Sequence, residues 1–195
     1  MPRRKTIFTK GHYYHIYNRG ANRERIFFNQ ENYLYCLHLM KKYFGQHQIA
    51  VIAYCLMPNH YHFLLRQDGE IAISKVISQL FNAYVLAVNN QQGRSGTLFA
   101  GRFRDVHVDK ESYLIHLCRY IHANPVKAGL MADPGEWPYS NYLEWVGERP
   151  GTLIDRAFVA TYFPTAPDAT YREFVLDYLR DVQSLPEDIG RYLFE

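Results

Sequence analysis

The sequence of 195 residues predicts an α+β fold with a largely antiparallel sheet and flanking helices. Strand-like and helix-like segments alternate irregularly, and the connections between them are short. Two strand-like runs, residues 49–57 and 60–66, are separated by only Pro58 and Asn59, which is the spacing of a hairpin or near-hairpin. The first run is almost continuously apolar, as is typical of a strand buried on both faces.

The predicted first strand and first helix lie before this hairpin. Residues 12–18 are rich in aromatic side chains and are expected to form a strand. Asn29 is a suitable N-cap for a helix that reaches about Phe44, and Gly45 is expected to end it. The apolar stripe of this helix is made of Tyr33, Leu37, Met40 and Phe44.

Two further helices and a strand follow the hairpin. Residues 71–88 repeat apolar side chains at intervals of three and four, which predicts an amphipathic helix. Residues 102–108 alternate as a strand does, and Asp109 can cap a helix over residues 110 to about 124. Pro125 is expected to end that helix, because the residue before a proline avoids helical backbone angles.

The last third of the chain has a different character. Residues 129–146 are loop-like, and a helix is predicted from about residue 168 to 182. Its apolar face consists of Tyr171, Phe174, Val175, Tyr178 and Leu179. We therefore expect a main domain over residues 1–149 and a C-terminal helical extension over residues 150–195.

Charge and cysteine content narrow the class of protein. A formal charge of +3 is compatible with binding nucleic acid but does not demand it. Cys36, Cys55 and Cys118 are widely spaced in apolar runs, which favours reduced core thiols in a cytoplasmic protein. The basic N-terminus has no apolar segment after it, and no stretch approaches the ~20 residues of a membrane span. We expect neither a signal peptide nor a membrane partner.

His60 and His62 are the first candidates for a functional site. Residues at i and i+2 of a strand project from the same face, roughly 6.5–7 Å apart along the chain, so the two imidazoles can converge on one metal ion. The alternative is that both are polar side chains with ordinary hydrogen-bond partners. The pair alone does not decide between these interpretations.

Tyr120 and Asn124 are the second pair of candidates. They are four residues apart on a predicted helix and therefore share one face. Tyr120 is either a reactive group or a tyrosine at the rim of the core, with its ring inside and its hydroxyl in solvent. Asn124 is either part of a site or the C-cap of a helix that stops before Pro125.

Four segments in the same order together resemble a known family. They are MPNHYHFLL at residues 57–65, LFAGRF at 98–103, YL and RYIHANPVKAGL within 113–130, and WPYS at 137–140. The sequence is similar over about residues 10–145 to the REP-associated tyrosine transposases, which are IS200-like, one-tyrosine HUH single-strand DNA transposases. The resemblance implies the ferredoxin-like, RRM-like HUH nuclease fold. Residues after about 150 carry no motif of the family.

The resemblance also implies roles for individual residues. His60 and His62 match the metal-binding pair of the family, Tyr120 matches the nucleophile, and Asn124 matches the polar residue that completes the metal site. The sequence departs from the family at Tyr61, where a plainly apolar residue is usual, and we expect this ring to point into the core. The implied cofactor is Mg²⁺, which prefers oxygen ligands, or Mn²⁺, which tolerates imidazole better.

The implied reaction joins Tyr120 to DNA through a phosphotyrosine bond, so rejoining the strands needs no nucleotide, and the sequence has no Walker-type phosphate loop. The expected partner is single-stranded DNA with hairpins of the repetitive extragenic palindrome type, bound by a monomer or a homodimer. Candidate DNA contacts are Arg94, Arg102 and Arg104, interleaved with Phe99 and Phe103, and a basic arm of Arg3, Arg4 and Lys5. These side chains could equally belong to a solvated loop and strand edge.

Two other functions fit the same residues. One is a metal-dependent phosphodiesterase with water as the nucleophile, which would form no covalent adduct with DNA. The other is a module that binds hairpins without cutting them and retains the histidines as vestiges.

Overall fold

The computed structural model describes residues 6–164 and 167–180. Its centre is a sheet with the strand order β2-β3-β1-β4, in which every neighbouring pair is antiparallel. The strands are β1 (Tyr13–Arg19), β2 (Ile49–Met57), β3 (His60–Gln67) and β4 (Arg104–Val108). The prediction of an antiparallel α+β sheet is confirmed, including the hairpin that joins β2 to β3 through Pro58 and Asn59.

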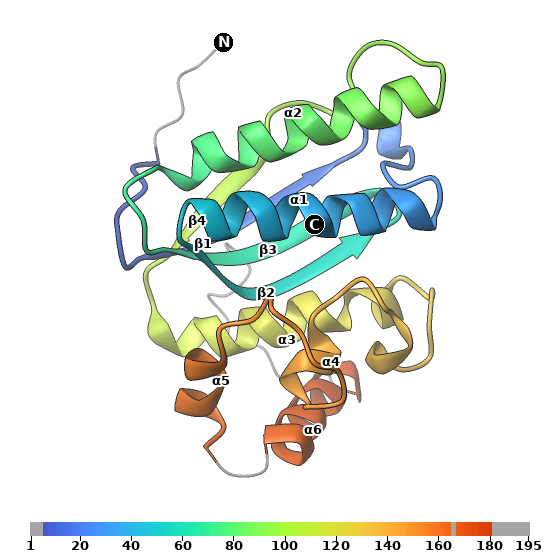
Figure 1. Ribbon diagram of the computed structural model, residues 1–195. Helices are drawn as coiled ribbons and strands as arrows, with labels where there is room; N and C mark the ends of the chain where they lie inside the picture. Colours follow the sequence, from blue (N-terminus) through green and yellow to red (C-terminus); the bar gives the residue numbers. More distant parts are fainter. Residues whose placement is uncertain (1–5, 165–166, 181–195) are drawn as a thin grey trace.

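Helices cover both faces of the sheet (Figure 1). One face carries α1 (Gln30–Gln46) and α2 (Ile73–Gln91), and the other carries α3 (Glu111–Lys127). The order β1-α1-β2-β3-α2-β4 is that of a ferredoxin-like fold, as expected. On the side of α3 lie α4 (Tyr142–Trp145), α5 (Arg156–Tyr162) and α6 (Pro167–Arg180). Two short 3₁₀ turns, Ala21–Arg23 and Pro134–Glu136, complete the described secondary structure.

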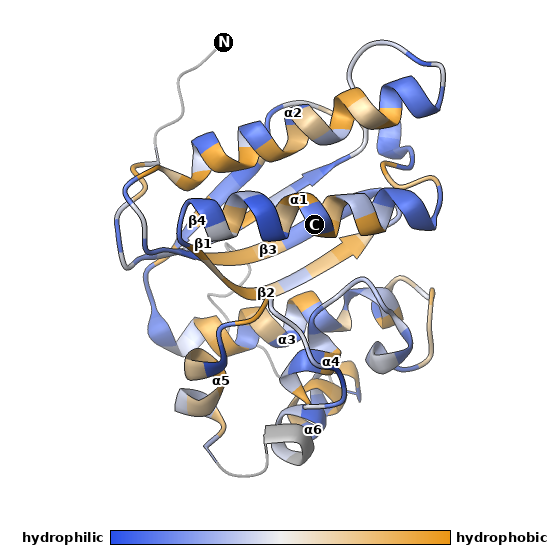
Figure 2. Ribbon diagram, in the orientation of Figure 1, coloured by the Kyte–Doolittle hydropathy of each residue, from blue (hydrophilic) through white to orange (hydrophobic). Residues whose placement is uncertain are grey.

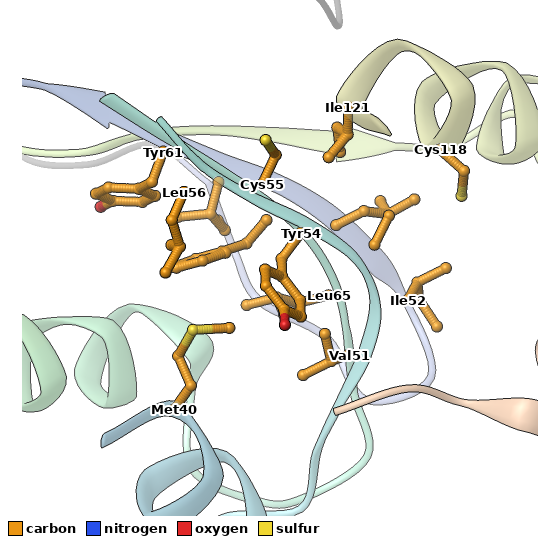
Figure 3. Close-up of a cluster of buried hydrophobic side chains, with 14 of the residues drawn as sticks. Met40, Val51, Ile52, Tyr54, Cys55, Leu56, Tyr61, Leu65, Cys118 and Ile121 are labelled. Atoms are coloured by element: carbon orange, nitrogen blue, oxygen red, sulfur yellow. The ribbon is translucent and has the colours of Figure 1, made fainter. Parts of the chain in front are cut away.

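The core has two layers because the sheet is buried on both faces. Figure 2 shows the apolar side of α2 turned toward the sheet and its polar side turned outward. In Figure 3, Cys55 of β2 points toward Ile121 of α3, whereas Tyr54 points to the side of Met40 on α1. Tyr61 lies inside this second layer with its ring stacked 4.3 Å from that of Phe81, so the expectation that it fills the core is confirmed.

The first helix begins as predicted but ends later. The side chain of Asn29 accepts a hydrogen bond from the backbone N–H of Asn32, which confirms the N-cap. The prediction that Gly45 ends the helix is wrong, because α1 continues to Gln46 and the left-handed residue is Gln48 (φ 52°). A glycine inside a helix costs only about 1 kcal/mol relative to alanine, so it need not end one.

The helix that carries Tyr120 also departs from the prediction at both ends. Asp109 is not its N-cap, since Lys110 occupies that position without a side-chain capping bond. Pro125 lies inside the helix, which continues to Lys127. The end is instead a Schellman motif at Gly129 (φ 68°), whose N–H bonds to the carbonyl of Val126, while the next N–H bonds to the carbonyl of Pro125. The glycine, not the proline, sets the boundary.

The outer edge of β2 is covered by the segment that follows α3. The N–H of Leu56 donates to the carbonyl of Tyr139 (2.9 Å), and the indole N–H of Trp137 donates to the carbonyl of Leu56 (3.0 Å). The indole of Trp145 donates to the carbonyl of Ile52 (2.9 Å). This segment therefore covers the edge of β2 and is joined to it by an isolated bridge between Cys55 and Ser140. The predicted loop over residues 129–146 is confirmed apart from the short 3₁₀ turn and α4.

The C-terminal residues pack on the rest of the chain. Asp155, just before α5, donates its N–H to the carbonyl of Val51 and forms an ion pair with Arg66 of β3 (2.8 Å). On α3, the guanidinium of Arg119 lies 4.2 Å from the ring centroid of Phe174 on α6. The predicted helix near the C-terminus is confirmed up to Arg180, and its expected end at residue 182 lies outside the described residues. The division at residue 149 stays a prediction.

The three cysteines are buried free thiols, as expected, and burial raises the pKa of each. In the part of the chain that the structure describes, no helix is long and apolar enough to span a membrane.

Candidate active site

The strand register puts the candidate side chains on the sheet face that α3 covers. His62 of β3 is directly opposite Tyr17 of β1, and His60 is opposite Arg19. Residues that face each other across paired strands project from the same side of the sheet. His15, two residues before Tyr17, therefore lies on this side as well.

The two histidines of β3 meet at nearly a right angle. Their ring centroids are 5.1 Å apart, and the ring planes are inclined by 87°. Nδ1 of His60 is 2.6 Å from Oδ1 of Asn59, and Nδ1 of His62 is 3.0 Å from Nε2 of His15. Both hydrogen bonds use Nδ1, so Nε2 is the nitrogen with which each ring would bind a metal ion.

Burial keeps both imidazoles in the form that binds metals. Burial lowers the pKa of His60 to about 4. The pKa of His62 is lowered well below its usual value, first by burial and then by the neighbouring His15 and His60. A neutral imidazole is the state that coordinates a metal ion, so the donor chemistry fits one at neutral pH.

Tyr120 reaches this pair from α3. Its side chain is 5% exposed, and its ring meets the ring of His62 edge to face, with 5.7 Å between the centroids and 84° between the planes. His15 lies 6.5 Å away in a similar orientation. The ammonium of Lys127, two turns later on α3, is 5.5 Å from the centroid of the Tyr120 ring.

Asn124 lies one turn after Tyr120 and is half-buried. Its amide nitrogen donates to the carbonyl of Tyr120 (2.8 Å), which leaves the amide oxygen as the atom that would bind a metal. Among the described residues, no group of three or more His, Cys, Asp or Glu side chains is arranged to hold a metal ion. The candidate donor atoms for a metal ion are therefore the Nε2 atoms of His60 and His62 and the amide oxygen of Asn124.

The three candidate arginines lie in different places. Arg104 of β4 is opposite Tyr17 and belongs to the face that carries the histidines. Arg102 lines a groove of about 570 Å³ on the side of α2. Arg94 turns back onto its own loop, where its Nη2 is 3.4 Å from the carbonyl of Thr97.

The aromatic residues among these arginines are less accessible than predicted. Phe99 is only 8% exposed and packs against Phe81 and Tyr61, with centroid distances of 5.1 and 5.9 Å. It is a core residue, and it also lines the groove of Arg102. Phe103 is partly buried and lines the groove beside Arg102. The basic arm at residues 3–5 lies outside the described residues.

Sequence reasoning missed two residues of the site, His15 and Lys127. His15 lies in a strand that was recognised, and its spacing of two from Tyr17 indicates a shared face. Only the pairing of β1 with β3 brings it to His62. Lys127 follows Pro125, so it was placed beyond the expected end of the helix.

The comparisons agree with this architecture. Residues 8–124, more than half of the chain, match the family model described as transposase IS200 like. No curated protein matches the sequence. The match places the chain among the transposases. It belongs to the IS200-like transposase family, as the sequence motifs indicated.

Solved structures are similar to the chain as well. One is a REP-associated tyrosine transposase bound to a REP hairpin, with 18% identity and a TM-score of 0.65 over 80% of this chain and 94% of the other. At this identity the likeness establishes the fold. Another is a protein of Deinococcus radiodurans R1 assigned as a transposase, with 16% identity and a TM-score of 0.42 over 62% of this chain and 95% of the other. The second match adds nothing to the assignment of the fold.

Proposed function

We propose that this transposase is a metal-dependent single-strand DNA endonuclease and strand transferase that works through a covalent link to Tyr120. The observation that carries the proposal is the contact of the Tyr120 ring with His62, at 5.7 Å between centroids. It puts a potential nucleophile beside a neutral imidazole that suits a metal ion. The membership of the chain in the IS200-like family supports this interpretation.

In the proposed reaction, one set of residues would hold the metal ion and Tyr120 would be the nucleophile. The site would hold Mg²⁺ or Mn²⁺ through His60, His62 and Asn124, and the bound ion would polarise the scissile phosphate. The hydroxyl oxygen of Tyr120 attacks phosphorus and loses its proton. A bond from phosphorus to the tyrosine oxygen forms, the bond from phosphorus to one backbone oxygen breaks, and that oxygen leaves with a proton as a free hydroxyl. A second hydroxyl can reverse the step and join the strands.

The proposed substrate is single-stranded DNA next to a hairpin. The structural neighbour is bound to a REP hairpin, which supports a hairpin of the same kind for this chain. Arg104 lies on the face of the histidines and would contact phosphates close to the reaction. Tyr120 must approach phosphorus in line with the leaving oxygen, and a flexible single strand bends into such a site at less cost than a stiff duplex.

The proposal can be tested with an end-labelled single-stranded hairpin, Mn²⁺ and a denaturing gel. We expect a DNA band that migrates with the protein and disappears after protease treatment, together with the released DNA fragment. Cleavage without a covalent adduct would favour water as the nucleophile. Binding without any cleavage, with or without metal, would favour the non-catalytic hairpin-binding module.

A further inference from the structure

Lys127 occupies an unusual position at the end of α3. Side chains on a helix lean toward its N-terminus, so this lysine extends back along the row that contains Asn124 and Tyr120. Its ammonium lies 5.5 Å from the centroid of the Tyr120 ring and 5.1 Å from that of Tyr178 on α6. It also donates a hydrogen bond to the hydroxyl of Tyr178 (2.8 Å).

These contacts fix the position of the ammonium without neutralising its charge. Its partners are a neutral hydroxyl and two ring faces, and among the described residues no carboxylate forms an ion pair with it. Tyr178 is fully buried, so the group that holds the lysine belongs to the packed contact between α3 and α6. Lys127 itself is exposed and can bind a ligand from solvent.

We infer that Lys127, held in place by Tyr178, binds one phosphate group of the DNA strand next to Tyr120. An ammonium has three donors, so the bond to Tyr178 leaves two for phosphate oxygens. The neighbouring tyrosine is the residue to which the scissile phosphate would be joined, so this phosphate is the scissile one or its neighbour. The inference rests on the proposed function, and it gives the C-terminal extension a part in binding DNA.

The ordinary explanation of Lys127 is structural. A cation in the last turn of a helix interacts favourably with the helix dipole, and a lysine stem can cover aromatic rings. A structural role predicts changes in thermal stability only. A phosphate contact predicts a change in the salt dependence of DNA binding, which a structural role would not alter.

The test measures binding of a fluorescein-labelled single-stranded hairpin by anisotropy between 50 and 300 mM NaCl. All chains carry Tyr120→Phe, so that no DNA is cut. We expect Lys127→Gln to reduce the slope of log affinity against log salt by about 0.7, the value for one phosphate of a single strand, and to weaken binding about fourfold at 150 mM salt. Lys127→Arg should keep the slope. Tyr178→Phe should weaken binding and leave the slope unchanged. The charge of Lys127 remains in this variant, but the hydroxyl that fixes its position is lost.

The matched control is Lys10→Gln, which removes an exposed lysine that is already paired with Glu70 (2.8 Å). It should leave both affinity and slope unchanged. The inference would be overturned if Lys127→Gln and its parent had equal salt slopes. It would also be overturned if Lys127→Arg and Lys127→Gln lost the same amount of affinity. Neither result would affect the proposed function. A parent chain that binds no hairpin at any salt concentration would overturn the proposed function and the inference with it.

Discussion

The ring of Tyr120 meets the ring of His62 edge to face, at 5.7 Å and 84°. One residue belongs to α3 and the other to β3, so the contact depends on the docking of α3 onto the open face of a ferredoxin-like sheet. His15 supports it from the next strand by its hydrogen bond to His62 (3.0 Å). The site is thus assembled from three elements that are distant in sequence.

Replacement of the proposed nucleophile is the most direct test of the mechanism. We expect Tyr120→Phe to abolish the covalent adduct and to reduce cleavage by at least about a thousandfold, because only the attacking oxygen is lost. Folding and hairpin binding should be retained. Tyr113→Phe, on the same helix and also buried, should cleave normally. Cleavage at an undiminished rate by Tyr120→Phe would contradict the tyrosine mechanism.

Removal of both histidines of β3 tests the metal site. A ligand that binds only the folded state stabilises it by about 2.7 kcal/mol at one hundred times its dissociation constant. Thermal unfolding of the parent should therefore shift upward with Mn²⁺, and the double variant His60→Ala, His62→Ala should lose the shift. The control is His12→Ala, His107→Ala, which removes an exposed histidine pair whose nitrogens are 2.8 Å apart. A metal response that survives in the first variant would place the ion elsewhere.

The form of the substrate provides a third test. We expect cleavage of a single strand beside a hairpin and little action on the fully paired duplex of the same sequence. Arg104→Ala and Arg102→Ala should each weaken binding and reduce its salt dependence by about one phosphate contact. The two arginines lie on opposite sides of the sheet, so an effect at Arg102 would mean that the DNA extends to the groove beside α2. Equal cleavage of single-stranded and duplex DNA would rule out the proposed substrate.

His122 should make folding sensitive to acid. It is fully buried between Tyr171 and Asn141, with nitrogen–oxygen distances of 2.6 and 2.8 Å, and burial lowers its pKa to about 4. Between this value and about 6.5, the pKa of an exposed histidine, the unfolded chain binds the extra proton, so the free energy of unfolding rises with pH across this window.

The size of this effect can be measured by urea unfolding. Between pH 5 and 7, His122 should account for about 2 kcal/mol of the gain in stability. His122→Phe should show a gain that is smaller by that amount, on top of a lower stability at every pH. His60, His62 and His116 also have lowered pKa values and contribute in the same direction to both chains. An unchanged pH dependence in the variant would contradict the assignment.

Asn141 is expected to be the most sensitive polar residue of the core. Its oxygen accepts from the N–H of Tyr54 (2.7 Å), and its nitrogen donates to the carbonyls of Ile52 (3.0 Å) and Leu153 (3.3 Å). Asn141→Ala leaves buried groups unsatisfied at about 1–3 kcal/mol each, so a loss of at least about 3 kcal/mol is expected in chemical unfolding. Asn90→Ala, on the exposed end of α2, should change stability by less than about 0.5 kcal/mol.

Some secondary-structure elements could be predicted from the residues within them. The apolar run of β2, the short turn after it and the spacing of three and four in α2 are properties of the nearest neighbours in sequence. The shared face of His60 and His62 was predicted for the same reason, since residues two apart in one strand share a face wherever the strand lies. Tyr120 followed from its helix and from the family motifs.

Other features of the structure departed from the prediction or were not predicted. Pro125 was expected to end α3, but the backbone bonds around Gly129 close the helix two residues later. Phe99 lies among the candidate DNA-contact arginines in the sequence, yet its ring packs on Phe81 of α2. α5 is a short helix of seven residues that was not predicted, and Asp155 both caps it and forms an ion pair with Arg66. The packing of Phe99 is decided by residues that are distant in sequence, whereas the end of α3 depends on Gly129, only four residues after Pro125.

The cover over β2 has a consequence for hydrogen exchange. A strand at the edge of a sheet normally exchanges its outward amides quickly, because water reaches them directly. In β2 these amides donate to Asn141 and to the carbonyl of Tyr139, at 2.7 and 2.9 Å. Deuterium can replace the protons of Tyr54 and Leu56 only when the covering segment lifts away. In an exchange experiment β2 should therefore behave as an interior strand, and its outward amides should become labelled together with the indole protons of Trp137 and Trp145.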